Sequence, residues 1–113
     1  MGCIFCRIIN REIPAKIVFE NERVFAFCDN APQAPVHILI IPKEHIASLN
    51  DLTENHQMLI GEMQNVARTV AAQLGVAQSG YRVVVNCGAD AGQAVDHIHY
   101  HLIGGRKLSW PPG

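Results

Sequence analysis

The sequence has no long apolar segment, no excess of one charge and no internal repeat. Its longest apolar run, 36–42, is interrupted by His37 and is far shorter than the ~20 residues of a membrane-spanning helix. Nine Lys and Arg against ten Asp and Glu give a net charge of -1, which supplies too few cations for nonspecific binding to nucleic acid. The first residues show no charged region followed by an apolar stretch, so we expect no secretory signal. These absences predict a soluble, cytoplasmic protein that binds neither membranes nor nucleic acid.

The composition favours one domain with reduced cysteines. Hydrophobic residues make up 49% of the 113 residues and charged residues 17%, so the chain can build a core and suits a single domain over 1–113. Of the four cysteines, Cys28 and Cys87 stand alone in apolar stretches, where a free Cys packs as a small hydrophobe. Cys3 and Cys6 form a close pair, which in a reducing compartment indicates a metal or redox site.

The spacing of the apolar residues predicts an α+β fold. Residues 3–12 are compatible with a short helix, and residues 53–74 carry apolar residues three and four apart, the period of a long amphipathic helix. Apolar or β-rich runs bounded by turn residues predict five strands, at 16–20, 23–29, 36–41, 81–86 and 95–103. The long helix falls between the third and fourth strands, so we expect a five-stranded, mostly antiparallel sheet with one long and one short helix.

Three of the six histidines alternate with apolar residues at 97–101. Alternate side chains of a strand share a face, so His97, His99 and His101 should line one side of the last strand. One interpretation is the solvated polar face of an edge strand. A second is a zinc site with an open position for water, and a third is a nucleophilic imidazole whose neighbours hold a phosphate. The spacing alone does not choose among them.

The segment His97-Ile98-His99-Tyr100-His101-Leu102-Ile103 has the His-x-His-x-His-x-x form, with apolar x, that names the histidine-triad (HIT) family. Similarity continues along nearly the whole chain, in segments 4–9, 12–15, 32–42, 80–86, 104–106 and 110–113. The sequence therefore resembles the Hint branch of that family. The resemblance implies a homodimer with the HIT-like fold, which binds an AMP-type purine nucleotide and hydrolyses adenosine phosphoramidates to AMP.

The resemblance also implies roles for individual residues. His99 matches the nucleophile that becomes transiently adenylylated, and we expect its second ring nitrogen to donate to a backbone carbonyl. His101 matches the histidine that contacts the phosphate, and His37 matches a fourth histidine that supports the site. Three further groups match nucleotide-binding positions: Asp29 and Asn30 at the ribose; Phe5, Ile8, Ile13, Phe27 and Leu39 around the purine; and Asn86, Gly92, Gln93 and Ala94 in or before a glycine-rich loop near the phosphate.

One of these positions departs from the family pattern. Many Hint proteins carry Ser where this chain has Ala94, and that hydroxyl is thought to assist the leaving amine. A second hypothesis is therefore a nucleotide-binding regulatory module with negligible turnover.

The close cysteine pair is half of a zinc site by spacing, and no second pair follows at zinc-finger spacing. Some bacterial HIT proteins ligate one zinc with such a pair, the His of a Pro-Lys-x-His segment and the first histidine of the triad. By that resemblance Cys3, Cys6, His45 and His97 are the zinc ligands here. Four protein ligands fill the coordination sphere, so we expect a structural zinc. A zinc-dependent hydrolase is the third functional hypothesis.

Overall fold

Residues 2–113 are described by a computed structural model, and five strands within them form one antiparallel sheet. The strands are β1 (Ile17–Glu20), β2 (Val24–Cys28), β3 (Val36–Pro42), β4 (Tyr81–Val85) and β5 (Tyr100–Gly104). Their order across the sheet is β1-β2-β3-β5-β4, and every neighbouring pair is antiparallel. The helices are α1 (Ile4–Ile9) and α2 (Gln57–Gln73). The predicted α+β fold, with one short and one long helix, is confirmed.

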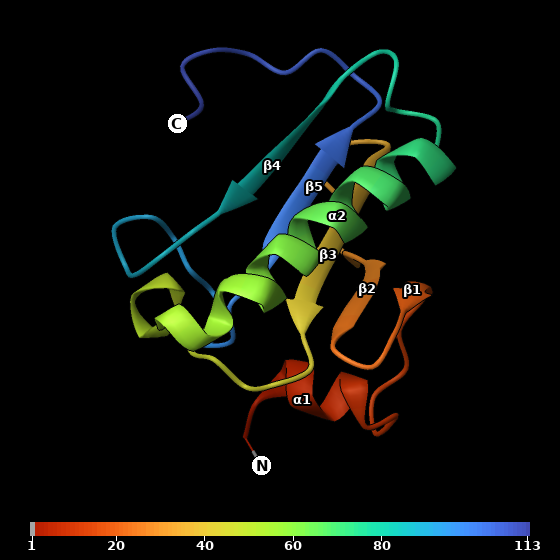
Figure 1. The fold of residues 1–113 in the computed structure, drawn as a ribbon. Helices are drawn as coiled ribbons and strands as arrows, with labels where there is room; N and C mark the ends of the chain where they lie inside the picture. The colour runs from red at the N-terminus through yellow and green to blue at the C-terminus, as the bar shows by residue number, and fades with distance from the viewer. Residues whose placement is uncertain (1) are drawn as a thin grey trace.

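Helix α2 lies across one face of the sheet (Figure 1). Its apolar stripe is buried there, and alternate residues of β2 and β3 meet it because side chains of a strand alternate between faces. This core contains Leu59, Met63, Val66, Ala67, Val70 and Ala71 of α2 and Val24, Ala26, Ile38 and Ile40 of the sheet. Within residues 2–113 neither helix combines the length and hydrophobicity that crossing a bilayer requires.

Helix α1 packs on the opposite face, near one end of β2 and β3. Phe5 and Ile8 of α1 join the other set of alternating strand residues in a second core cluster. That cluster contains Phe25, Phe27, Leu39 and Ile41. The two faces of the sheet therefore carry different layers, and the smaller helix leaves part of its face for other side chains.

The long helix begins later than the period of its apolar residues predicts. A 3-10 turn, Glu54–His56, precedes α2, and the α-helix starts at Gln57 rather than at residue 53. Thr53 caps this turn: its hydroxyl accepts from the Asn55 N–H, and its own N–H donates to Nδ1 of the His56 ring. The polar caps fix the first turn in the tighter geometry before the apolar stripe begins.

The last strand is also shorter than expected, because β5 begins at Tyr100 rather than at residue 95. The residues before it do not continue the β-ladder: one bonds to the segment after β3, and another uses its side chain on the last residue of β3. The N–H of Ile98 donates to the Ile46 carbonyl at 2.7 Å, and the His97 ring donates through Nε2 to the Pro42 carbonyl at 2.8 Å. Two of the three triad histidines therefore precede the strand on which the sequence analysis placed them.

Candidate nucleotide site and metal centre

Three imidazoles lie together on the face of the sheet opposite α2. Ile98, Tyr100 and Leu102 belong to the α2 core, so the intervening His99 and His101 point the other way. The ring centroids of His99 and His101 are 5.0 Å apart, and those of His101 and His37 are 5.2 Å apart. The expected shared face is confirmed for this pair, and β3 adds His37 from across the sheet.

His99 has one ring nitrogen committed to the backbone. Its Nδ1 lies 2.8 Å from the His97 carbonyl, which can only accept, so Nδ1 carries the hydrogen. The lone pair of the neutral ring is then on Nε2, the nitrogen that can attack an electrophile. The Phe5 ring meets His99 edge-on at 5.1 Å between centroids. The expected contact between a His99 ring nitrogen and a backbone carbonyl is confirmed.

His37 and His101 are ordered by a backbone N–H. The Gln33 N–H donates to Nδ1 of His37 at 3.0 Å, which places the hydrogen of a neutral His37 on Nε2. This Nε2 lies 2.9 Å from Nδ1 of His101 and 3.4 Å from Asp29 Oδ2. If His37 donates to His101, the hydrogen of His101 is on its own Nε2. His101 then offers a donor, where His99 offers a lone pair.

Burial, and then the neighbouring His99 and His37, lower the pKa of His101 from its ordinary value of 6.5 to about 4. His101 is therefore neutral near pH 7. Its role as a donor consequently depends on the tautomer rather than on a positive charge.

An apolar cavity of about 270 Å³ lies beside these rings. The residues that the sequence analysis assigned to the nucleoside all line it: Phe5, Ile8, Ile13, Phe27, Leu39, Asp29 and Asn30. Its wall is apolar on the α1 side, while the acidic and amide side chains stand at the end of β2. Such a cavity can hold a flat heterocycle and leave a carboxylate for sugar hydroxyls.

A larger cavity of about 670 Å³ lies on the other side of the histidines. His37, His101 and Asn86 line it, together with Arg82 and Arg106. His99 is buried and lines neither cavity, but its ring meets Phe5 of the apolar cavity and His101 of the larger one.

The sequence analysis assigned no role to Arg82, Arg106 or Gln33, although all three line the larger cavity. For Arg82 a signal was available, because it alternates with Tyr81 and Val83 along β4 and so faces the triad side. The positions of Arg106 and Gln33 depend on contacts between distant segments.

The glycine-rich loop, residues 88–94, is held by hydrogen bonds between its own backbone groups. The Gly92 N–H donates to the Ala89 carbonyl and the Gln93 N–H to the Gly88 carbonyl, so neither is directed at a ligand. The Gln93 side chain donates to the carbonyls of Ala47 and Val95. Ala94 lines a cavity with Cys3 and His45, whereas Asn86 lines the cavity of His101. The structure thus brings Asn86 to the histidines and places Gly92, Gln93 and Ala94 farther along the loop.

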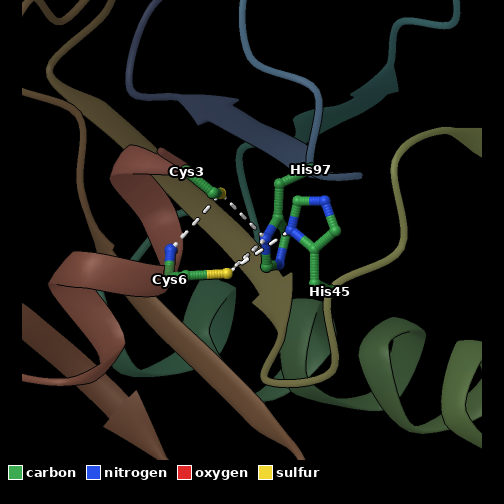
Figure 2. A group of neighbouring side chains, drawn as sticks. All are labelled: Cys3, Cys6, His45 and His97. Atoms are coloured by element: carbon green, nitrogen blue, oxygen red, sulfur yellow. Dashed lines mark hydrogen bonds between the residues drawn. The ribbon is translucent and has the colours of Figure 1, made fainter. Parts of the chain in front are cut away.

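Cys3, Cys6, His45 and His97 converge between α1, the segment after β3 and the segment before β5 (Figure 2). Cys3 Sγ lies 3.4 Å from His97 Nδ1, and Cys6 Sγ lies 3.4 Å from His45 Nδ1 and 3.7 Å from His97 Nδ1. A tetrahedral zinc with Zn–S bonds of about 2.3 Å and Zn–N bonds of about 2.0–2.1 Å separates sulfur from nitrogen by about 3.6 Å. The four side chains therefore have the chemistry and the spacing of a zinc site.

Neighbouring groups favour the forms of these side chains that can bind a cation. The Pro42 carbonyl holds the hydrogen of His97 on Nε2, which turns the Nδ1 lone pair toward the sulfurs. Burial lowers the pKa of His97 and keeps the ring neutral. Burial and the adjacent Cys3 thiol raise the pKa of Cys6, so a bound cation would favour the Cys6 thiolate.

Asp29, His37 and His101 form a second cluster of possible ligands. Here the two ring nitrogens are 2.9 Å apart, a hydrogen-bond distance. Two nitrogen ligands of a tetrahedral zinc would be about 3.4 Å apart. This cluster is a hydrogen-bonded chain rather than a metal site.

The chain was compared with known proteins. The HIT domain family matches residues 10–108. The chain is 50% identical over 112 residues to the 14 kDa zinc-binding protein of Zea mays, covering 97% of this chain and 87% of that protein. It is 48% identical over 112 residues to the adenylylsulfatase HINT1 of Arabidopsis thaliana, covering 97% of this chain and 76% of that protein.

Solved structures give the same result. A HIT family hydrolase from Legionella pneumophila matches with a TM-score of 0.97 and 47% identity, over 99% of this chain and 100% of that chain. A histidine triad nucleotide-binding protein from Candida albicans matches with a TM-score of 0.82 and 33% identity, over 97% of this chain and 83% of that chain. The chain belongs to the histidine-triad family, in its Hint branch.

Proposed function

We propose that this protein is a nucleotide-binding hydrolase that cleaves the P–N bond of adenosine 5'-phosphoramidates through a nucleotidyl-histidine intermediate. The observation that carries the proposal is the Nε2 lone pair of His99, which the His97 carbonyl fixes. The His99 ring meets Phe5, which lines the apolar cavity, and His101, which lines the larger cavity. A purine in the apolar cavity with its ribose at Asp29 would bring the α-phosphate to these rings.

The reaction has two displacements at phosphorus. Nε2 of His99 attacks the α-phosphorus, the P–N bond breaks, and the amine leaves after it gains a proton. Water then attacks the phosphorus, the P–N bond to His99 breaks, and AMP is released. The Nε2–H of His101 would donate to a phosphoryl oxygen whose negative charge grows in both steps.

The test is incubation with adenosine 5'-phosphoramidate, with AMP release and a covalent adenylyl-protein as the readouts. Removal of the nucleophile in His99→Ala should abolish the covalent species and reduce turnover by at least ~1,000-fold, while AMP affinity changes far less. A matched control is His56→Asn, which removes a half-buried histidine at the start of α2 and should keep wild-type turnover. Near-normal turnover of His99→Ala would overturn the assignment.

Identifying the leaving group that the protein accepts requires a panel of substrates rather than one compound. The Arabidopsis relative is named an adenylylsulfatase, so adenosine 5'-phosphosulfate belongs beside AMP-amine and AMP-lysine substrates. Ala94 supplies no hydroxyl to the leaving amine and lies away from the cavity of His101. If the protein binds AMP and turns over none of these compounds, the regulatory-module hypothesis replaces the enzyme.

We further propose that Cys3, Cys6, His45 and His97 hold one structural zinc. The protein supplies four ligands with zinc-like spacing, and a relative at 50% identity is named a zinc-binding protein. With four protein ligands no position remains for a reactive water. A zinc-dependent hydrolase predicts loss of turnover with zinc in folded protein, whereas a structural zinc predicts loss of stability.

Assembly and location complete the proposal. We infer a homodimer in the cytoplasm, where all four cysteines, which form no disulfide here, would stay reduced. Fractionation of cells with an antibody to the protein tests the location, and the mass of the protein in solution tests the dimer.

A further inference from the structure

Arg106 follows β5 and lies against the loop that precedes β3. The chain reaches this place through Gly105, whose φ of +91° suits glycine, and a Cβ there would lie 2.9 Å from the Pro35 side chain. The close approach fixes the end of β5 on the 32–35 loop. Arg106 is thereby held beside the backbone of Gln33.

The Arg106 guanidinium is occupied by backbone oxygens. Its Nε and Nη2 donate to the Gln33 carbonyl at 3.1 and 3.0 Å, and Nη1 donates to the Lys107 carbonyl at 3.0 Å. All three nitrogens therefore have partners on the chain itself. Because its hydrogen bonds go to the backbone, this guanidinium is suited to fixing the 32–35 loop rather than to binding a ligand.

Gln33 is held from both sides. Its carbonyl accepts from Arg106, and its N–H donates to Nδ1 of His37, whose side chain is almost completely buried. Because the loop is fixed through its carbonyl, its N–H stays directed at the ring. The sequence of contacts runs from Arg106 through the Gln33 backbone to His37 and then to His101.

We propose that Arg106 is a positioning residue for the phosphate-contacting histidine, acting through the Gln33 backbone and His37 to fix the tautomer of His101. Without Arg106 the 32–35 loop can shift, and the Gln33 N–H no longer requires a lone pair on Nδ1 of His37. Apart from His101, only the 3.4 Å contact with Asp29 Oδ2 then favours hydrogen on Nε2 of His37. The hydrogen can move to Nδ1 in a fraction of the molecules, and His101 can place its hydrogen on Nδ1 instead of Nε2. The donor that should face the phosphoryl oxygens is lost in that fraction of molecules.

The first test reads the tautomers and does not depend on the proposed activity. In protein labelled with ¹⁵N-histidine, two-bond N–H correlations distinguish Nδ1–H from Nε2–H rings. We expect His37 and His101 of the wild-type protein to be Nε2–H tautomers, and Arg106→Ala to show mixed tautomers at one or both rings. Arg68→Ala, which removes an exposed arginine of α2 that bonds only Asn65, should match the wild type. Wild-type tautomers in folded Arg106→Ala overturn the proposal.

The second test uses turnover and rests on the proposed function. Arg106→Ala should lower kcat on adenosine 5'-phosphoramidate by about tenfold, with less than about a twofold change in AMP affinity. Arg106→Lys keeps the charge without the two-pronged contact and should restore only part of the loss. If the wild-type protein shows no turnover, the proposed function fails while the tautomer result still decides the role of Arg106. Full turnover in Arg106→Ala overturns that role.

A second pair of variants keeps the test decisive if Arg106→Ala does not fold. Gln33→Pro removes the N–H that His37 accepts, whereas Gln33→Ala keeps both backbone groups and removes only the side chain. We expect mixed tautomers in Gln33→Pro and wild-type tautomers in Gln33→Ala. The same spectra for both variants contradict the role of this backbone N–H.

Discussion

Backbone hydrogen bonds make the rings of His99 and His101 offer different groups at Nε2. A carbonyl on Nδ1 of His99 leaves a lone pair on its Nε2, while the N–H of Gln33, acting through His37, leaves a hydrogen on Nε2 of His101. One ring can attack phosphorus and its neighbour can donate to a phosphoryl oxygen. Neither function requires a charged imidazole, which agrees with the lowered pKa of His101.

The pKa of His101 has a consequence for stability. Its value of about 4 in the folded protein lies below the ordinary 6.5, so the folded state binds fewer protons than the unfolded state between these values. Stability from this group is complete above about pH 6.5 and is lost as the pH falls toward about 4. The wild-type melting temperature should therefore decrease over this range, and His101→Gln should show a smaller decrease.

Melting curves at pH 4.5 and 7 for both proteins measure this difference. Gln57→Ala replaces an exposed residue that does not titrate, and it should retain the full wild-type decrease. Part of the decrease should remain in His101→Gln, since burial also lowers the pKa of His97. Equal decreases in wild type and His101→Gln would show that burial does not hold His101 neutral.

The sequence predicted residues whose placement depends on local pattern or on a motif. The sequence placed His99 and His101 on one face through the alternation at 97–101, and through the resemblance it indicated the four candidate zinc ligands. It did not predict the role of Arg106, whose contact with Gln33 joins residues 73 positions apart. That contact exists only because β5 pairs with β3 and Gly105 packs on Pro35, and neither event has a local signal.

For α2 and β5, the local pattern predicted the element but not the residue at which it begins. The period of the apolar residues predicted α2, but the Thr53 cap converted its expected first turn to a 3-10 turn. The predicted start of β5 was wrong because Ile98 bonds to Ile46, which follows β3, and the His97 ring bonds to Pro42 at the end of β3. Periodicity describes which face a side chain occupies, whereas the end of a strand depends on where its neighbour stops pairing.

Helix α1 depends on its packing and on the metal cluster. Six residues are too few for a helix that is stable alone. Phe5 and Ile8 attach it to the sheet, and Cys3 and Cys6 attach its first turn to His97, which is more than 90 positions away in the sequence. The Phe5 ring also meets the rings of His97 and His99, so the candidate metal ligands, the helix and the proposed nucleophile share one packed region.

Loss of a zinc ligand should release α1 from the sheet. Purified wild-type protein should contain about one zinc per chain, because the site offers four ligands. Cys3→Ser should lower zinc content and reduce stability by about 2 kcal/mol or more, a decrease in melting temperature on the order of 10 °C. Elemental analysis and calorimetry measure both quantities.

Cys87→Ser is the matched control for the zinc ligand, because it removes a thiol outside the cluster and should keep the metal and the melting temperature. Below its melting temperature, Cys3→Ser should retain most of its turnover, since His99 does not contact the metal site through a ligand atom. Wild-type protein that purifies without zinc, or turnover that follows zinc content in folded protein, contradicts a structural metal.

The two faces of the sheet differ in polarity. The α2 face is a continuous apolar core. The opposite face is apolar under α1 and polar at His37 and His101, which line the larger cavity. The C-terminal segment passes over this side: Arg82 of β4 donates to the Ser109 carbonyl at 3.0 Å, and its guanidinium lies over the Trp110 ring.

A dimer is the expected assembly, and β4 is its expected contact. Most of the apolar stripe of α2 is buried on the chain's own sheet, although Met58 of this helix is exposed. Strand β4 is an edge strand with two exposed hydrophobic side chains, Tyr81 and Val83, each 37% exposed. Trp110, which lies beside Arg82 of this strand, is 79% exposed. Such an edge pairs readily with another chain. A stable dimer buries about 800 Å² per partner, which requires the surroundings of β4 as well as the strand itself.

Matched charge substitutions on the two edges of the sheet test this arrangement. Val83→Glu on β4 and Ile17→Glu on β1 replace residues of similar exposure, 37% and 39%. Light scattering at micromolar concentration should give twice the chain mass for the wild type and for Ile17→Glu. Val83→Glu should dissociate at least about tenfold more readily, because a carboxylate buried in a contact without a partner costs well over 1 kcal/mol. A wild-type monomer at that concentration rules out the dimer, and dissociation of Ile17→Glu alone moves the contact to the β1 edge.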